Sequence, residues 1–255
     1  MNARTLVRSL AGVLLALLVA SPALAITYGV DDGNGHPNVG ALVGTYSGGQ
    51  YAYCSGTLIA PIVFLTAAHC GENGEAVIVT FDPVFADGLN TTYTGTFYAD
   101  PLYTQRQNIS HDLAVVVLDT AVSGITPAQL PTLNQLTTLG KNQQFTAVGY
   151  GGQEITNAPG GKVFTYLDTR EVATSTFNAL NPGYLRLSQN PATGNGGTCY
   201  GDSGGPNFLG AGAGETNITA GTTITGDRYC RSTNVTYRLD TPAARAFLGQ
   251  FVTLP

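Results

Sequence analysis

The sequence predicts an all-β protein, a barrel or a sandwich, that ends in one helix. Short runs rich in β-branched and aromatic residues recur along the chain and are separated by clusters of Gly, Pro, Asn and Asp. These runs lie at residues 39–46, 55–68, 76–81, 112–119, 144–151, 184–190, 218–225 and 235–240. Helical periodicity is clear only after Thr241, which can cap a helix that opens with Pro242 and continues as "AARAFLGQFV".

The first 25 residues have the features of a secretory signal. Arg4 and Arg8 precede an apolar run at residues 10–20, and "SPALA" ends in a small-x-small cleavage pattern. The apolar run is too short to span a bilayer, and no later segment reaches about 18 continuous apolar residues. We therefore expect a chain that is cleaved after Ala25, is secreted and has no membrane contact afterwards.

The composition indicates a compact, loop-rich globular protein. The chain is 43% hydrophobic and only 11% charged, and it holds 33 glycines. Its formal net charge is −5 and its Lys and Arg residues are scattered, which excludes an extended basic surface for nucleic acid. The sequence has no EF-hand loop and no metal-binding cluster, so we expect no cofactor and no metal, and we expect a monomer.

A stretch with Gly and Pro at residues 123–131 divides the mature chain into two nearly equal halves, each with its own strands. We expect the halves to be residues 26–125 and 126–255.

The cysteines favour disulfides over metal ligation. Cys54, Cys70, Cys199 and Cys230 are an even number in a chain with a secretory signal, and none form a CxxC pair. Three connectivities are open to four cysteines. The simplest expectation pairs Cys54 with Cys70 and Cys199 with Cys230.

The stretch "TCYGDSGGPNF" places Ser203 among glycines that allow a tight turn. A serine hydroxyl becomes a good nucleophile when a base takes its proton, and histidine is the usual base. His69, in "LTAAHC", follows an apolar strand and precedes a cysteine. The pattern Gly201-x-Ser203-x-Gly205 also fits an α/β-hydrolase elbow, but that fold needs a histidine after the serine and none follows His111.

Three blocks, "LTAAHC", "HDLAVVVL" and "CYGDSGGP", resemble in order and spacing the signature blocks of the chymotrypsin–trypsin family of serine proteases. The segments "CSGTLIAPIVFLTAAHC" and "AVGYGG" extend the resemblance over essentially all of residues 26–255. It implies a chymotrypsin-like fold: two antiparallel Greek-key β-barrels, with His69 and Asp112 on the first and Ser203 on the second.

The resemblance also implies the roles of the site residues. Ser203 is expected to be the nucleophile, His69 the general acid and base, and Asp112 the carboxylate that orients the imidazole. The backbone amides of Gly201 and Ser203 are expected to form an oxyanion hole. Asp119 is an alternative acid in the same block, but its place at a strand end indicates a solvated turn residue.

Asp202 is expected to have a structural role. In the family, the acid before the nucleophile pairs with the α-ammonium of the mature N-terminus. Cleavage after Ala25 would make Ile26 the first residue, in "ITYG", which resembles the start of mature family members. Signal removal by itself would then release the activating residue.

The resemblance places a specificity pocket at Gly197, Thr198, Thr225, Gly226 and Asn234. The floor position, six residues before Ser203, carries no fixed charge, and a buried Lys or Arg without a partner is costly. We therefore expect a preference for apolar or aromatic side chains rather than trypsin-like specificity. An inward-facing Arg228 or Arg231 would favour acidic side chains, although exposed loop positions are the simpler interpretation.

The functional hypothesis is a secreted serine endopeptidase that acts on proteins or peptides. The alternative is a catalytically silent binding protein with the same fold, and a third possibility is action mainly on esters. The presence of all three triad residues and the glycine-rich turn favours the enzyme.

Overall fold

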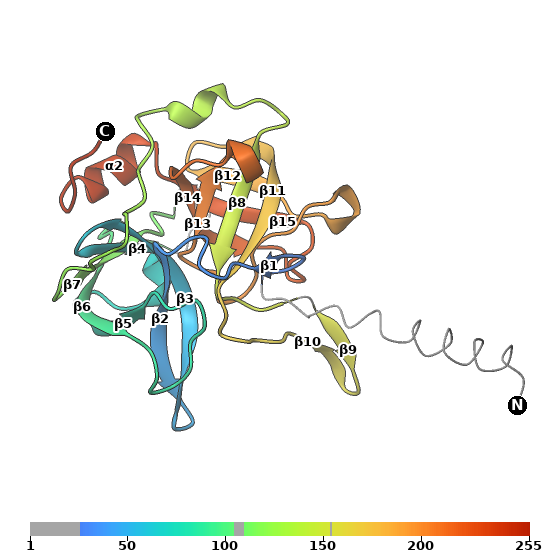
Figure 1. Ribbon diagram of the computed structural model, residues 1–255. Helices are drawn as coiled ribbons and strands as arrows, with labels where there is room; N and C mark the ends of the chain where they lie inside the picture. Colours follow the sequence, from blue (N-terminus) through green and yellow to red (C-terminus); the bar gives the residue numbers. More distant parts are fainter. Residues whose placement is uncertain (1–25, 105–109, 154) are drawn as a thin grey trace, which may run out of the picture.

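The computed structural model describes residues 26–104, 110–153 and 155–255, so the expected signal segment and its cleavage site lie almost entirely outside them. The described chain forms two antiparallel β-barrels side by side, with an α-helix near the C-terminus (Figure 1). This confirms the predicted two-barrel, chymotrypsin-like fold.

The first barrel is a closed ring of strands in the order β2-β3-β4-β7-β6-β5. The strands are β2 (Val39–Tyr46), β3 (Gly49–Ala60), β4 (Val63–Thr66), β5 (Ala76–Thr80), β6 (Thr92–Ala99) and β7 (Ala114–Leu118). The predicted run at residues 55–68 divides into β3 and β4 at a turn that begins at Pro61, a residue that cannot donate to a strand ladder.

The second barrel closes because β8 pairs with both β11 and β13. Its strands are β8 (Gln144–Gly149), β11 (Glu171–Leu180), β12 (Tyr184–Ser188), β13 (Pro206–Leu209), β14 (Thr219–Gly226) and β15 (Thr233–Arg238). A short strand near the N-terminus, β1 (Val30–Asp31), pairs with β11, so the N-terminal segment lies on the second barrel. The division between residues 125 and 126 stays a prediction.

The remaining elements are short. A hairpin of β9 (Thr156–Ala158) and β10 (Gly161–Val163) extends away from the second barrel (Figure 1). The described residues also include the 3₁₀ helices η1 (Ala68–Cys70), η2 (Gln135–Thr138), η3 (Pro191–Thr193) and η4 (Gly212–Gly214). Across the described ranges, no helix combines the length and apolar character needed to cross a membrane.

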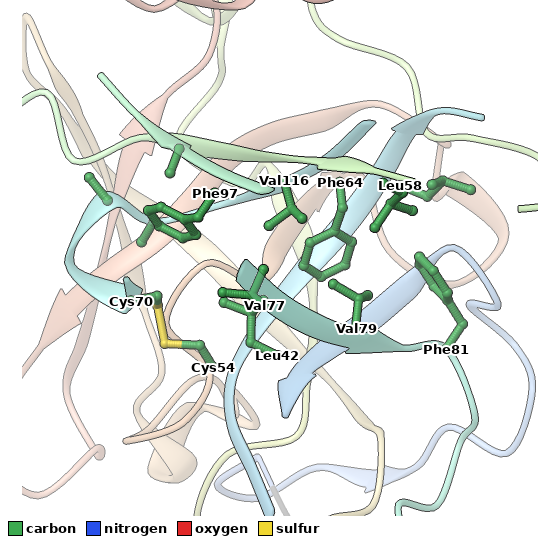
Figure 2. Close-up of a cluster of buried hydrophobic side chains, with 14 of the residues drawn as sticks. Leu42, Cys54, Leu58, Phe64, Cys70, Val77, Val79, Phe81, Phe97 and Val116 are labelled. Carbon is green, nitrogen blue, oxygen red and sulfur yellow. A yellow bond between two sulfur atoms is a disulfide. The ribbon is translucent and has the colours of Figure 1, made fainter. Parts of the chain in front are cut away.

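Alternating side chains from all the strands of the first barrel fill its interior (Figure 2). Phe64, Phe97 and Val116 are fully buried there. The Cys54–Cys70 disulfide closes one end of this core, next to η1. Burying such side chains contributes roughly 1.5–3 kcal/mol each, so the barrel is a rigid support for residues at its rim.

The C-terminal helix α2 (Pro242–Leu248) begins as the sequence predicts. The Thr241 hydroxyl accepts a hydrogen bond from the Ala244 amide at 3.2 Å, and Pro242 occupies the first turn. Phe247 and Leu248 pack in one cluster with Leu65 and other residues of the first barrel. The helix belongs to the second half of the sequence, but it packs against the first barrel.

A buried polar cluster fastens the N-terminal segment to the second barrel. Arg170 has no exposed surface, and its Nε donates to Asp32 at 2.8 Å. His36 contacts Asp32 through Nδ1 and Glu215 through Nε2, the latter at 2.7 Å. The ring of His36 stacks on Phe208. These contacts fix residues 32–36 as they cross towards the first barrel.

Candidate active site

His69 and Asp112 are brought together by neighbouring strands of the first barrel. β4 pairs with β7, and His69 follows the first of these strands while Asp112 precedes the second. His69 Nδ1 lies 2.8 Å from Asp112 Oδ2, and the His69 amide donates to Asp112 Oδ1 at 3.0 Å. A carboxylate accepts only, so Nδ1 carries the proton and the opposite nitrogen, Nε2, is left free to act as a base.

Ser203 comes from the second barrel, in the loop before β13, and lines the same cavity of about 240 Å³ as His69. Its carbonyl accepts a hydrogen bond from the Ser55 amide of the first barrel at 2.8 Å. Next along the chain, the Gly204 amide donates to the Thr223 carbonyl at 2.8 Å. The Ser203 hydroxyl makes no hydrogen bond within the described part of the chain. The position of Ser203 is therefore fixed by the hydrogen bonds of the backbone around it.

The turn at Gly201 leaves two backbone amides available beside Ser203. Gly201 has φ +97°, a conformation that other residues rarely adopt. Neither the Gly201 amide nor the Ser203 amide donates to any of the residues described here, whereas the Asp202 amide between them donates to the Cys199 carbonyl. Two free amides at a glycine turn are the arrangement that can accept a developing oxyanion.

Asp202 points away from this cavity and is completely buried. Its two carboxylate oxygens accept from the Gly151 and Cys199 amides, each at 2.8 Å. Burial raises the pKa of Asp202 to about 7, because the two amides only partly offset the loss of solvation. A buried carboxyl of this kind calls for a cationic partner.

The glycines of "AVGYGG" make room for Asp202. A Cβ atom added at Gly149 would lie 2.2 Å from Asp202 Oδ1, and one at Gly151 would lie 2.5 Å from its Cγ. Residues with side chains at Gly149 and Gly151 would therefore collide with the buried Asp202 carboxyl.

The sulfur atoms of Cys54 and Cys70 lie within 4.8 Å of one ring nitrogen of His69, which is a spacing compatible with metal ligands. The two sulfurs are bonded to each other, so they are not thiolates and cannot hold a cation. The second disulfide joins Cys199 to Cys230, so both local pairs are present.

Comparison with known proteins agrees with this geometry. The family model described as "Trypsin" matches residues 32–247, most of the chain. The chain belongs to the trypsin family. It is 27% identical over 189 residues to a chymotrypsin of Phaedon cochleariae, a match that covers 71% of this chain and 65% of that relative.

Solved structures support the trypsin-family fold. The structure described as "atomic resolution structure of HBP" superposes with a TM-score of 0.68 over 90% of this chain and 98% of that one. At 18% sequence identity, this likeness bears on the fold alone.

Three of the expected pocket residues, Thr198, Thr225 and Gly226, line the cavity beside Ser203. The other two do not. Asn234 is fully buried, and its Nδ2 donates to Asn207 Oδ1 at 2.9 Å. At Gly197 a Cβ would lie 2.4 Å from Gln189 Oε1, so the Gln189 side chain occupies the space over this glycine.

The first residues that the structure describes, Ile26 and Thr27, contact the segments around the site. Ile26 is fully buried and packs in one cluster with Ala147. The Thr27 hydroxyl lies 3.1 Å from the Gly197 carbonyl and 2.8 Å from the Cys230 carbonyl. The Thr27 hydroxyl therefore ties this segment to Cys230, which lines the cavity, and to Gly197, which does not.

Ser55 forms a contact between the two barrels that the sequence did not predict. Its hydroxyl donates to the Gly201 carbonyl at 3.0 Å and accepts from the Tyr150 amide at 3.0 Å. Ser55 thus crosses between the barrels to hold the glycine turn. The only signal in the sequence was a serine next to Cys54, which is uninformative without the barrel register.

Proposed function

We propose that this trypsin-family protein is a secreted serine endopeptidase in which Ser203, His69 and Asp112 form the catalytic triad. The observation that carries the proposal is the convergence of Ser203 and His69 on one cavity, with Asp112 bonded to His69 Nδ1 and two free amides beside the serine. The similarity to a chymotrypsin supports the same reaction class.

The mechanism follows from these positions. Ser203 Oγ attacks the substrate carbonyl carbon and gives its proton to His69 Nε2, while Asp112 stabilises the imidazolium. The carbonyl oxygen becomes an oxyanion that accepts from the Gly201 and Ser203 amides. His69 then protonates the leaving amine, the C–N bond breaks and an acyl-enzyme remains. A water that gives its proton to His69 releases the carboxylic acid and restores Ser203.

The buried acid supports activation by signal removal. Ile26 packs against Ala147, and Gly149, two residues further on the same face of β8, contacts Asp202. Cleavage after Ala25 would create an ammonium at Ile26, and an ion pair with Asp202 would satisfy a carboxyl that otherwise has only two amide donors. That pair would fix the turn at Gly201.

The pocket favours uncharged substrate side chains. Thr198, Thr225 and Gly226 line it, together with Ile224 and Asp227. The Asp227 carboxylate is directed to its own loop, where it accepts hydrogen bonds from four backbone amides. These hydrogen bonds outweigh the effect of burial and lower the pKa of Asp227. We therefore expect apolar or aromatic residues rather than Lys or Arg before the cleaved bond.

The test is hydrolysis of a diverse peptide library by the mature protein and by Ser203→Ala, read by mass spectrometry. Intact mass of the secreted protein establishes whether it begins at Ile26. A serine-directed phosphonate should label the unmutated protein and not the variant. Cleavage by the unmutated protein alone is the expected result.

If both proteins begin at Ile26 and neither cleaves peptides nor reacts with the phosphonate, the endopeptidase proposal is wrong and a silent binding protein is favoured. Hydrolysis of matched esters without amides would instead indicate an esterase, since amide cleavage requires His69 to protonate the leaving amine.

A further inference from the structure

The loop after β14 forms one rim of the cavity at Ser203. Gly226, Asp227 and Cys230 line the cavity, and the Cys199–Cys230 disulfide ties this loop to the segment before the nucleophile. Asp227 accepts hydrogen bonds from the amides of Tyr229, Arg231, Ser232 and Thr233, which fixes the loop backbone. Held in this way, the loop presents Arg228, Tyr229 and Arg231 to solvent.

The β9–β10 hairpin brings a third cation to the same rim. Lys162 Nζ lies 4.0 Å from the centroid of the Tyr229 ring, on which Arg228 also lies, at 5.7 Å. Phe164, just after the hairpin, packs edge-on against Tyr200, 5.1 Å away. The Tyr200 hydroxyl in turn donates to the Arg228 carbonyl at 3.4 Å. Lys162 and Arg228, distant in sequence, therefore flank one exposed tyrosine beside the cavity.

Arg231 completes this group, which we call the basic rim: Lys162, Arg228 and Arg231. Its guanidinium lies 5.8 Å from the ring centroid of Tyr28, in the N-terminal segment. Aromatic rings hold cations in place without neutralising them. In the described chain, no carboxylate comes within ion-pair distance of any of the three cations.

The basic rim contrasts with the rest of the chain. The protein has 16 acidic and 11 basic residues, for a formal charge of −5. Of the other cations, Arg170 and Arg238 are buried in ion pairs with Asp32 and Asp240. A positive rim at the mouth of a cavity on a negative protein concentrates ligands that carry acidic groups.

We propose that the basic rim selects peptide substrates with an acidic side chain within a few residues of the cleaved bond. This inference rests on the endopeptidase function proposed above. The rim lies outside the pocket, so the carboxylate belongs to a residue that flanks the one in the pocket. Charge complementarity favours Asp and Glu at these flanking positions and opposes Lys and Arg.

The test uses peptides with one cleavable bond in which Glu, Gln or Lys stands at each of three positions on either side. At low ionic strength we expect kcat/KM to be about 5- to 10-fold higher with Glu than with Gln at one or more positions, and lower with Lys. At 1 M NaCl, where the Debye length is about 3 Å, the ratio should approach one.

The triple variant Lys162→Gln, Arg228→Gln, Arg231→Gln should lose the preference for Glu at every salt concentration. Lys141→Gln is the matched control, because Lys141 is exposed and lies just before β8, at the opposite end of that strand from Asp202. A wild type with no preference for Glu, or a preference that survives in the triple variant, overturns the inference.

Binding separates this inference from the proposed function. Anisotropy of the same labelled peptides on Ser203→Ala reports rim selectivity without catalysis, and Arg228→Gln alone serves if the triple variant does not fold. Selective binding without hydrolysis by the unmutated protein would retain the rim and reject the endopeptidase. Hydrolysis without a preference for Glu in either assay would retain the endopeptidase and reject the selectivity of the basic rim.

Discussion

Asp32, in the N-terminal segment, and Asp202, before Ser203, both have buried side chains, but their surroundings are opposite. Burial by itself would raise the pKa of Asp32, yet hydrogen bonds from His36 and Arg170 outweigh it and hold that pKa below the usual value. Asp202 receives only backbone amides, and burial raises its pKa to about 7. The acid with cationic partners is held in a network of ion pairs, and the acid without a cation is the neighbour of Ser203.

This difference indicates how the N-terminal segment is organised. Residues 32–36 are fastened by charges that are already present in the folded chain, through Asp32, His36 and Arg170. Residues 26–27 are fastened by burial and by the Thr27 hydroxyl. Under the proposed cleavage before Ile26, Asp202 would gain a cation as well, so the two ends of the segment would be fastened at different stages.

The largest effect is expected from breaking the paired cluster. Arg170→Met would leave Asp32 buried without its guanidinium, which should cost about 3–5 kcal/mol of unfolding free energy. Urea denaturation measures this loss. Arg186→Met is the control, because Arg186 is exposed and should change stability by less than about 0.5 kcal/mol. Equal losses in the two variants would show that the Arg170 cluster is not stabilising.

The next effect concerns the unpaired acid. Asp202→Asn would remove the charge that we propose to pair with Ile26, so the turn at Gly201 should lose its oxyanion geometry. We expect kcat/KM of the mature protein to fall by about 100- to 1,000-fold, equivalent to about 2.7–4 kcal/mol. Asp119→Asn, at an exposed acid that accepts from the Thr94 hydroxyl, should retain activity. Full activity of Asp202→Asn would contradict the ion-pair proposal.

The third prediction concerns the pH dependence of stability that His36, the partner of Asp32, should cause. Burial would lower its pKa, but the hydrogen bonds that His36 donates to the Asp32 and Glu215 carboxylates outweigh burial and raise it to about 9, above the ordinary 6.5. Because the folded state holds the proton more tightly, this contribution is complete below about pH 6.5 and is lost as pH rises through 9.

The expected loss over that pH range is about 3 kcal/mol of unfolding free energy, because each pH unit between 6.5 and 9 contributes about 1.4 kcal/mol. Urea denaturation at pH 6.5, 8 and 9.5 should show it in the wild type and show a flatter dependence in His36→Gln. Parallel curves for the two proteins would rule out a role for this imidazolium.

The smallest expected effect is at the contact between the barrels. Ser55→Ala removes the hydroxyl between the Gly201 carbonyl and the Tyr150 amide, and a hydrogen bond of this kind contributes about 1 kcal/mol. We expect kcat to fall about 5-fold with KM nearly unchanged, because Ser55 positions the turn and does not touch substrate. A rise in KM alone would indicate that Ser55 supports the pocket instead.

Much of the fold could be read from local patterns. The apolar runs predicted most strands, and the cap at Thr241 before Pro242 predicted where α2 begins. Three barrel strands were missed. β13 has only four residues and opens with a proline, and β6 and β11, "TYTGTFYA" and "EVATSTFNAL", are rich in Thr, Ser and Ala and carry weak apolar signals. The places of β6 and β11 follow from pairing with β5, β7, β8 and β12, a non-local requirement that a single stretch of sequence does not contain.

Local patterns in the sequence predicted an all-β fold with a C-terminal helix, and the resemblance of three sequence blocks predicted the family and its two barrels. The tertiary structure alone decided what surrounds the residues of the candidate site. Gln189 fills the space over Gly197, Ser55 holds the Gly201 turn, and Lys162 joins Arg228 at the rim. The physical reason is that motifs record backbone constraints between neighbours in the chain, whereas burial, pKa and pocket shape depend on side chains brought together from distant strands.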